Sequence, residues 1–151
     1  MSTDIRYHLI VHILIVLGKF LEILDPNTDY IKLASCLNLK NSTISQLAFH
    51  TNLKYLNLNK CRLIDRNGSW WIFSLIIVSQ YLKSLNRLEY LNLGFTQIQN
   101  ETVLEICNHN TQLEKLSLER CNITDASIEY MKQLPNLQYL NIGYCTQLTL
   151  E

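Results

Sequence analysis

Glycine and proline are scarce in this chain of 151 residues, which contains four glycines and two prolines. No glycine falls in a G-x-G-x-x-G or G-K-[ST] pattern, so we expect no phosphate-binding loop and no nucleotide cofactor. Charged residues make up only 17%, and 13 basic residues balance 13 acidic ones. A net charge near zero gives no field that would attract nucleic acid, and we expect no nucleic-acid partner.

Long hydrophobic runs are also missing. The strongest candidate for a membrane or targeting segment is residues 9–18, whereas a spanning helix needs about 20 mostly apolar residues. Lys19 and Phe20 follow the run, where a signal peptide would have a small-residue cleavage site. We therefore expect no membrane association and no secretory signal, which leaves the cytoplasm as the predicted location.

The cysteines do not form the pattern of a disulfide framework or a metal site. They number five, and no two of them form a C-x-x-C pair, which favours free, buried thiols in a reducing compartment. His8 and His12 lie four residues apart but have no evident third ligand, so we expect no metal. No cluster of titratable residues is recognisable, and the sequence therefore predicts neither an enzyme nor a cofactor.

The dominant feature that is present is an internal repeat. Four segments, which begin at Leu53, Leu88, Leu113 and Leu137, read L-x-x-L-x-[LI]-x-x-[CT]. A weaker fifth copy begins at Ala34, and successive starts lie 19, 35, 25 and 24 residues apart. Four matches at such regular spacing indicate a stack of repeats in which each unit buries the core of its neighbour.

Each copy alternates apolar and polar residues, which predicts a short strand. Strands of successive copies should align as one parallel sheet with their leucines turned toward a shared core. The ninth position carries a small residue that can hydrogen-bond inside the turn after the strand. These residues are Ser42, Cys61, Thr96, Cys121 and Cys145.

Helices are expected between the strands, on the other side of the sheet. Residues 100–107 and 122–134 keep helical spacing, with Asn100 as the cap of the first helix and Thr124 or Asp125 as the cap of the second. The segment from Ser69 to Leu85 predicts a third helix, which is apolar around much of its circumference. That helix either packs under a neighbouring element or presents a protein-contact patch.

The repeats carry recognisable family motifs. The stretch C-N-I-T-D-A-S-I begins at Cys121, I-C-N-H-N-T-Q-L-E-K-L begins at Ile106, and a looser copy, C-R-L-I-D-R-N-G, begins at Cys61. Over about residues 53–148 the chain resembles the cysteine-containing subclass of leucine-rich repeats, which is found in F-box proteins of ubiquitin ligases and in mitotic-exit-antagonist-like proteins. The resemblance implies an α/β leucine-rich-repeat solenoid, a short horseshoe arc with a parallel concave sheet and outer helices.

The chain divides into residues 1–33 and about five repeats over residues 34–151. Residues Ile5–Leu24 place apolar side chains on one helical face, which predicts an N-terminal capping helix. The stretch from Leu24 to Leu37 also resembles part of an F-box. In that alternative, Ile5–Leu37 would bind a ligase adaptor, and the protein would be a substrate receptor of a cullin-type ubiquitin ligase.

The end of the given sequence carries one further expectation. Leu150 and Glu151 follow the fifth predicted strand directly, without an outer helix. Because an uncovered parallel edge can pair with another chain, we expect self-association or partner docking at the last repeat.

The outward strand positions predict the function. Tyrosine and arginine are enriched at binding hot spots, asparagine offers adaptable hydrogen bonds, and repeat proteins bind on the concave face. The alternative is a solvated polar face whose asparagines bond one another. In the first repeat these positions would be held by Cys36, Asn38, Lys40 and Asn41. We predict a non-catalytic protein–protein interaction scaffold. Its predicted contact residues are Tyr55, Asn57, Tyr90, Asn92, Phe95, Lys115, Arg120, Tyr139, Asn141 and Tyr144.

Overall fold

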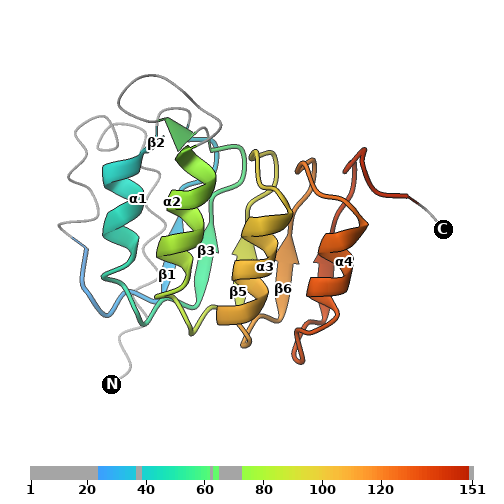
Figure 1. The fold of residues 1–151 in the computed structure, drawn as a ribbon. Coiled ribbons are helices and arrows are strands. Elements are labelled where there is room, and N and C mark those ends of the chain that lie inside the picture. Colours follow the sequence, from blue (N-terminus) through green and yellow to red (C-terminus); the bar gives the residue numbers. More distant parts are fainter. Residues whose placement is uncertain (1–23, 37–38, 62, 65–72, 150–151) are drawn as a thin grey trace.

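The structure is a computed structural model, and it describes residues 24–36, 39–61, 63–64 and 73–149. In this part of the chain, a sheet of five parallel strands forms one layer and four helices form the other (Figure 1). The predicted capping helix lies outside the described residues, except for Leu24 at its end. Most of the predicted adaptor-binding segment, Ile5–Leu37, lies outside them as well.

The five strands follow the chain order across the sheet. Their bounds are Tyr30–Lys32 (β1), Tyr55–Asn57 (β3), Tyr90–Asn92 (β5), Lys115–Ser117 (β6) and Tyr139–Asn141 (β7). Every pair of neighbours is parallel, and the register aligns the same motif position in each repeat, as in Leu56↔Leu91 and Leu91↔Leu116. The structure therefore confirms that the segments beginning at Leu53, Leu88 and Leu113 lie side by side as equivalent repeats, and that the segment at Leu137 follows them.

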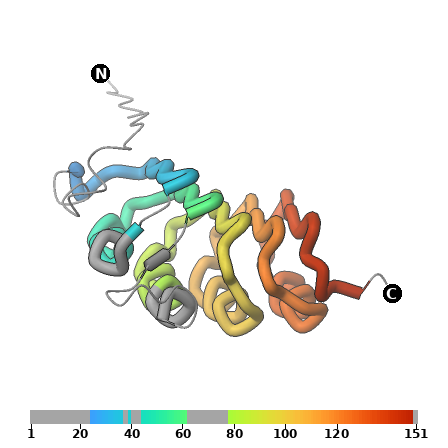
Figure 2. Tube along the Cα trace, turned by 90° about the horizontal axis from the view of Figure 1, so that it is seen from above, coloured from blue at the N-terminus to red at the C-terminus, as the bar shows by residue number. Residues whose placement is uncertain are grey.

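The helices connect successive strands and lie on one side of the sheet, as the row of coils in Figure 2 shows. They are Asn41–Leu47 (α1), Phe73–Leu82 (α2), Asn100–His109 (α3) and Asp125–Met131 (α4). A second, two-stranded parallel sheet was not predicted, and it pairs Leu39–Lys40 (β2) with Leu63–Ile64 (β4). Of the predicted segment Ser69–Leu85, residues 69–72 and the side chains of residues 73–77 lie outside the described part, whereas Val78, Leu82 and Leu85 are buried in the core.

One continuous core of leucines separates the two layers. Leu56, Leu91 and Leu116 are completely buried, because each lies between two neighbouring strands and beneath a helix layer. Leu140 holds the same motif position in β7, where only one described strand is a neighbour, and it is 36% exposed. Burial in this fold thus depends on having a repeat on both sides. Self-association at the β7 edge stays a prediction.

The first repeat differs from the prediction. Its strand is β1, which pairs Tyr30 with Tyr55, so the repeat begins at Thr28 and not at Ala34. Ile31 and Leu33 are its buried core residues. The error arose because Thr28 replaces the usual leucine, while apolar residues farther along imitated the motif. The first strand therefore lies within residues 1–33, which the sequence analysis assigned to the capping region.

This shift moves the predicted residues of the first repeat away from the sheet face. Cys36 is buried in the turn after β1, at the ninth motif position. Lys40 belongs to β2, and Asn41 and Ser42 belong to α1, so their predicted roles on the face and in the turn are wrong. Asn38 lies outside the described residues.

The ninth position forms hydrogen bonds in the other repeats as predicted, but the bonds of the three cysteines cross to the preceding repeat and are not confined to their own turns. Sγ of Cys121 donates a hydrogen bond to the carbonyl oxygen of Leu93 in the preceding repeat at 3.3 Å. Cys61 and Cys145 make the equivalent bonds at 2.8 and 3.1 Å, and Thr96 bonds within its own repeat. Burial raises the pKa of Cys121 to about 12, so this side chain remains a thiol and a donor at neutral pH.

The helix caps agree with the prediction only in the position of Thr124 at the start of α4. The residues that precede α3 and α4 are Gln99 and Thr124, and neither side chain caps its own helix. The Asn100 side chain instead accepts hydrogen bonds from the Thr124 amide at 2.9 Å and the Ser127 hydroxyl at 2.6 Å. In a stacked array the start of the next helix lies within reach, so Asn100 joins two repeats rather than capping one.

Asp125 makes a second unpredicted contact between segments. Its carboxylate accepts hydrogen bonds from the amide and the hydroxyl of Thr149, and these bonds hold the pKa of Asp125 below 3.8. A depressed pKa in the folded state means that the contact contributes its full stability above the unfolded pKa and loses it as the pH falls through the lower, folded value. We therefore expect the Thr149 amide resonance to titrate with a midpoint below 3.8.

The control for this titration is Asp125→Asn, in which the acid-dependent shift of the Thr149 amide should disappear. A midpoint at or above 3.8 in the unmodified chain would contradict the contact.

Candidate partner-binding surface

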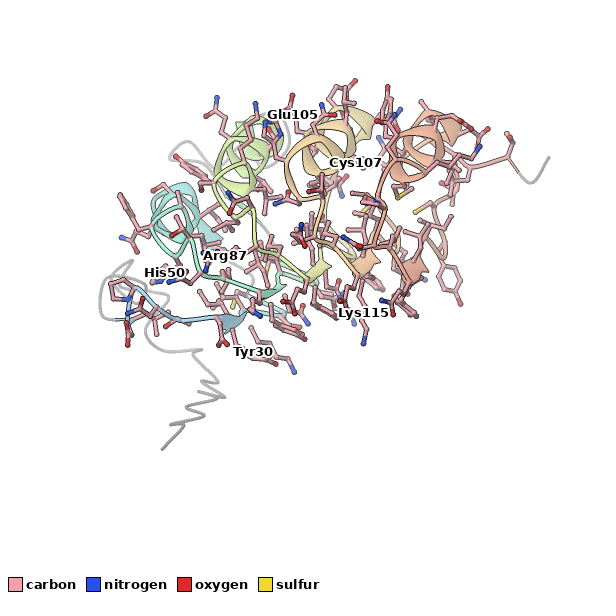
Figure 3. The ribbon with its side chains drawn as sticks, turned by 90° about the horizontal axis from the view of Figure 1, so that it is seen from below. Tyr30, His50, Arg87, Glu105, Cys107 and Lys115 are labelled. Carbon is pink, nitrogen blue, oxygen red and sulfur yellow. The ribbon has the colours of Figure 1, made fainter. Side chains whose placement is uncertain are left out.

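The open face is the side of the five-stranded sheet that points away from the helices. Figure 3 shows Tyr30 and Lys115 on this side, whereas Glu105 lies on the helix layer. Successive strand residues point to opposite sides, so the residues flanking each buried leucine must lie on the open face. Of the predicted contact residues, seven lie on its strands. The other three, Phe95, Arg120 and Tyr144, lie in the turns that follow, three residues beyond the end of a strand.

A tyrosine stack covers the first three strands of the open face. Tyr30 stacks on Tyr55, and Tyr55 stacks on Tyr90, with ring centroids 4.1 Å apart and interplanar angles of 12° and 9°. Each aromatic pair contributes about 0.5–1.5 kcal/mol beyond its buried area. Lys115 and Tyr139 continue the column in register. The rings are therefore ordered before any partner arrives.

The tyrosine hydroxyls are held by neighbouring amides. Asn92 Nδ2 donates to the Tyr90 hydroxyl at 3.3 Å, and Asn57 makes the same contact with Tyr55 at 3.5 Å. Burial raises the pKa of Tyr90, so its hydroxyl is neutral at physiological pH and is able to donate a hydrogen bond.

The asparagine column has a structural role that the sequence analysis did not assign. Oδ1 of Asn57, Asn92 and Asn141 accepts the backbone N–H two residues later, at 3.0, 2.9 and 3.0 Å. These bonds satisfy backbone donors where the chain leaves each strand. A role of these three residues in partner binding stays a prediction, since their oxygens already serve the turns.

The exit row is the set of side chains that lie in the turns after β3, β5, β6 and β7, three residues beyond the end of each strand. Its members are Lys60, Phe95, Arg120 and Tyr144, all with φ between 54° and 60°. Lys60 Nζ lies 4.8 Å from the centre of the Phe95 ring. Cζ of Arg120 lies 5.2 Å from the Phe95 ring and 5.0 Å from the Tyr144 ring. Cations and aromatic rings thus alternate along one edge of the open face.

The charge of the open face is not balanced. Four cations lie on its strands and exit row, and one carboxylate, that of Glu119, lies among them; the cations are Lys32, Lys60, Lys115 and Arg120. Where the strands begin, Lys54 is instead paired with Glu89 at 2.8 Å, and this bond raises the pKa of Lys54. In the described part of the chain, no carboxylate forms an ion pair with any of the four cations.

Among residues 24–36, 39–61, 63–64 and 73–149, no three His, Cys, Asp or Glu side chains come together as metal ligands. Among the same described residues, no helix has the length and apolar character needed to cross a membrane.

Comparison with known proteins identifies the architecture. A family model described as leucine-rich repeats in two copies matches residues 111–151. Among solved structures, the chain is similar to an internalin from Listeria monocytogenes, with a TM-score of 0.55 and 19% identity. The fold is a leucine-rich-repeat solenoid. The match covers 82% of this chain and 34% of the internalin chain, so the chain spans about a third of that protein's length. No curated protein matches the sequence significantly.

Tyr30, Lys32 and Lys60 are among the residues of the solenoid's open face that were missing from the predicted contact set. Tyr30 and Lys32 come from the first repeat, whose motif T-D-Y-I-K-L-A-S-C begins 25 residues before Leu53. That regular spacing was the signal that would have found them. Lys60 holds the same motif position as Phe95, Arg120 and Tyr144, and it contacts the Phe95 ring. Membership of the cysteine-containing subclass stays a prediction.

Proposed function

We propose that this solenoid is a non-catalytic scaffold that binds a protein partner on its concave open face. The observation that carries the proposal is the tyrosine stack, in which three rings are ordered at 4.1 Å spacing on a solvent-facing sheet. Ordered aromatic side chains supply contact area while losing little further entropy on binding. Tyr139 is 53% exposed and extends this surface toward the β7 edge.

The proposal includes a cytoplasmic location. All five cysteines are buried free thiols, which is compatible with a reducing compartment. The adaptor-binding role of Ile5–Leu37 is not part of the proposal, because residues 30–32 form a strand of the solenoid sheet and most of the segment lies outside the described residues.

The test removes the three predicted tyrosines of the open face. We expect the triple variant Tyr55→Ala, Tyr90→Ala and Tyr139→Ala to lose at least about tenfold in affinity for proteins captured by the unmodified chain, because truncation of a hot-spot tyrosine costs about 2 kcal/mol or more. Quantitative mass spectrometry of affinity-purified complexes identifies the captured protein, and binding to the purified partner then gives both affinities.

The matched control carries Tyr81→Ala and Tyr130→Ala, which lie in α2 and α4 on the other layer. Circular dichroism should show both variants folded at the assay temperature. Equal capture by the two variants would show that the open face is not the binding surface.

A further inference from the structure

The exit row has donors that the fold itself does not use. Arg120 contacts the Phe95 and Tyr144 rings, but no described carboxylate or carbonyl accepts a hydrogen bond from its guanidinium. Lys60 likewise contacts the Phe95 ring and no described anion. A cation held against aromatic rings keeps its charge and most of its N–H donors available to an oxygen ligand. The row therefore offers two ordered cations with an aromatic ring between them.

The four residues of the exit row share one backbone conformation. A residue other than glycine at positive φ costs of order 1 kcal/mol, and all four members adopt φ near +60°. Glycine would adopt this conformation without that cost. The chain places Gly94 one position earlier, where a Cβ would lie 2.7 Å from Asn59 Nδ2, and keeps large side chains in the row itself. Ser35 holds the same position in the first repeat with φ 65°, so this conformation recurs as part of the turn of each repeat.

We propose that the exit row binds an acidic segment of the partner protein, with one carboxylate on Arg120, a second on Lys60 and an apolar side chain against Phe95. The inference rests on the proposed function and adds the chemistry of the partner. Charge complementarity supports it, since the open face carries four cations and one carboxylate on a chain with no net charge. Arg120 offers a planar fork that matches a carboxylate.

The geometry also sets the spacing of the acidic residues. Lys60 and Arg120 follow strands separated by one other strand, which places their backbones about 10 Å apart. An extended segment covers that distance in about three residues. The partner segment is therefore expected to carry two acidic residues two to four positions apart, with an apolar residue between them.

The test uses a random dodecapeptide library displayed on phage and selected on the immobilised full chain. The expected result is enrichment of peptides with two Asp or Glu residues at this spacing. Fluorescence anisotropy with the most enriched synthetic peptide should then show at least tenfold weaker binding to Arg120→Gln and to Lys60→Gln. The control, Lys132→Gln on the other layer, should bind as tightly as the unmodified chain, and Arg120→Lys should give an intermediate loss.

The outcomes separate this inference from the proposed function. Selected peptides that lack acidic residues but bind less well to the triple tyrosine variant would overturn the acidic partner and leave the scaffold proposal intact. Acidic peptides that bind Arg120→Gln unchanged would also overturn it, as would the absence of any enriched peptide. Peptides whose binding responds to neither the tyrosine nor the exit-row substitutions would contradict both proposals.

Discussion

Replacement of Leu91 by alanine is expected to lower the free energy of unfolding by about 3–5 kcal/mol, which is the upper range for a buried leucine. Leu91 is completely buried in β5 and lies in register between Leu56 and Leu116. Leucines of neighbouring repeats contact it from both sides, so the structure cannot collapse into the cavity without moving two strands. The loss therefore combines transfer of the removed methyl groups with an unfilled cavity.

The matched control is Leu140→Ala, at the same motif position in β7. Leu140 is 36% exposed and has a described strand on one side only, so we expect a loss below about 1.5 kcal/mol. Urea denaturation followed by circular dichroism gives both values, provided that the slope of free energy against denaturant is unchanged. Similar losses in the two variants would mean that burial by neighbouring repeats does not govern stability here.

Replacement of Asn110 by aspartate is expected to destabilise the fold by about 3–5 kcal/mol at pH 7, as for an unpaired charge in a protein core. Asn110 is completely buried. Its Nδ2 donates to the carbonyl oxygens of Leu82 at 3.1 Å and Leu85 at 2.8 Å, at the end of α2. Aspartate has nearly the same shape, but its ionised form has no donor, so an anion would face two buried carbonyl oxygens.

The destabilisation should depend on pH with a definite sign. Burial and the two carbonyls raise the pKa of the introduced carboxyl above its unfolded value of about 3.9. A group with a raised folded pKa contributes most to stability below the unfolded pKa and loses that contribution as the pH rises through the folded pKa. The difference between Asn110→Asp and the unmodified chain should therefore shrink from pH 7 toward pH 4.

Asn136→Asp is the control for this substitution. Asn136 is exposed, and its Nδ2 also donates to a backbone carbonyl, that of Thr111 at 3.1 Å. Water can solvate both groups after the change, so the expected loss is below about 1 kcal/mol and independent of pH between 5 and 7. A loss of the same size in both variants would show that the buried donor is not what makes Asn110 important.

The repeat strands could be predicted because their signal is local. In the segments at Leu53, Leu88 and Leu113, apolar alternation and a small ninth residue lie within nine positions, and the structure aligns all three. The first repeat was misplaced because Thr28 lacks the apolar side chain that the pattern requires. Pairing with β3 places that strand at Tyr30–Lys32, and such pairing is not written in the residues of one segment.

Contacts between repeats could not be predicted from local pattern. The stacking of Tyr30 on Tyr55, the hydrogen bonds that Asn100 accepts from the next repeat and the ring contacts of Arg120 all join residues 24 to 27 positions apart. Which atoms meet depends on the register of the sheet and on how closely one repeat stacks on the next. Sequence spacing alone was therefore enough for the strands of the segments at Leu53, Leu88, Leu113 and Leu137 and for the helices between them. It did not locate β1 or the second sheet. The alternating exit row and the tyrosine stack arise only when the repeats are stacked, because each needs side chains from three or more of them.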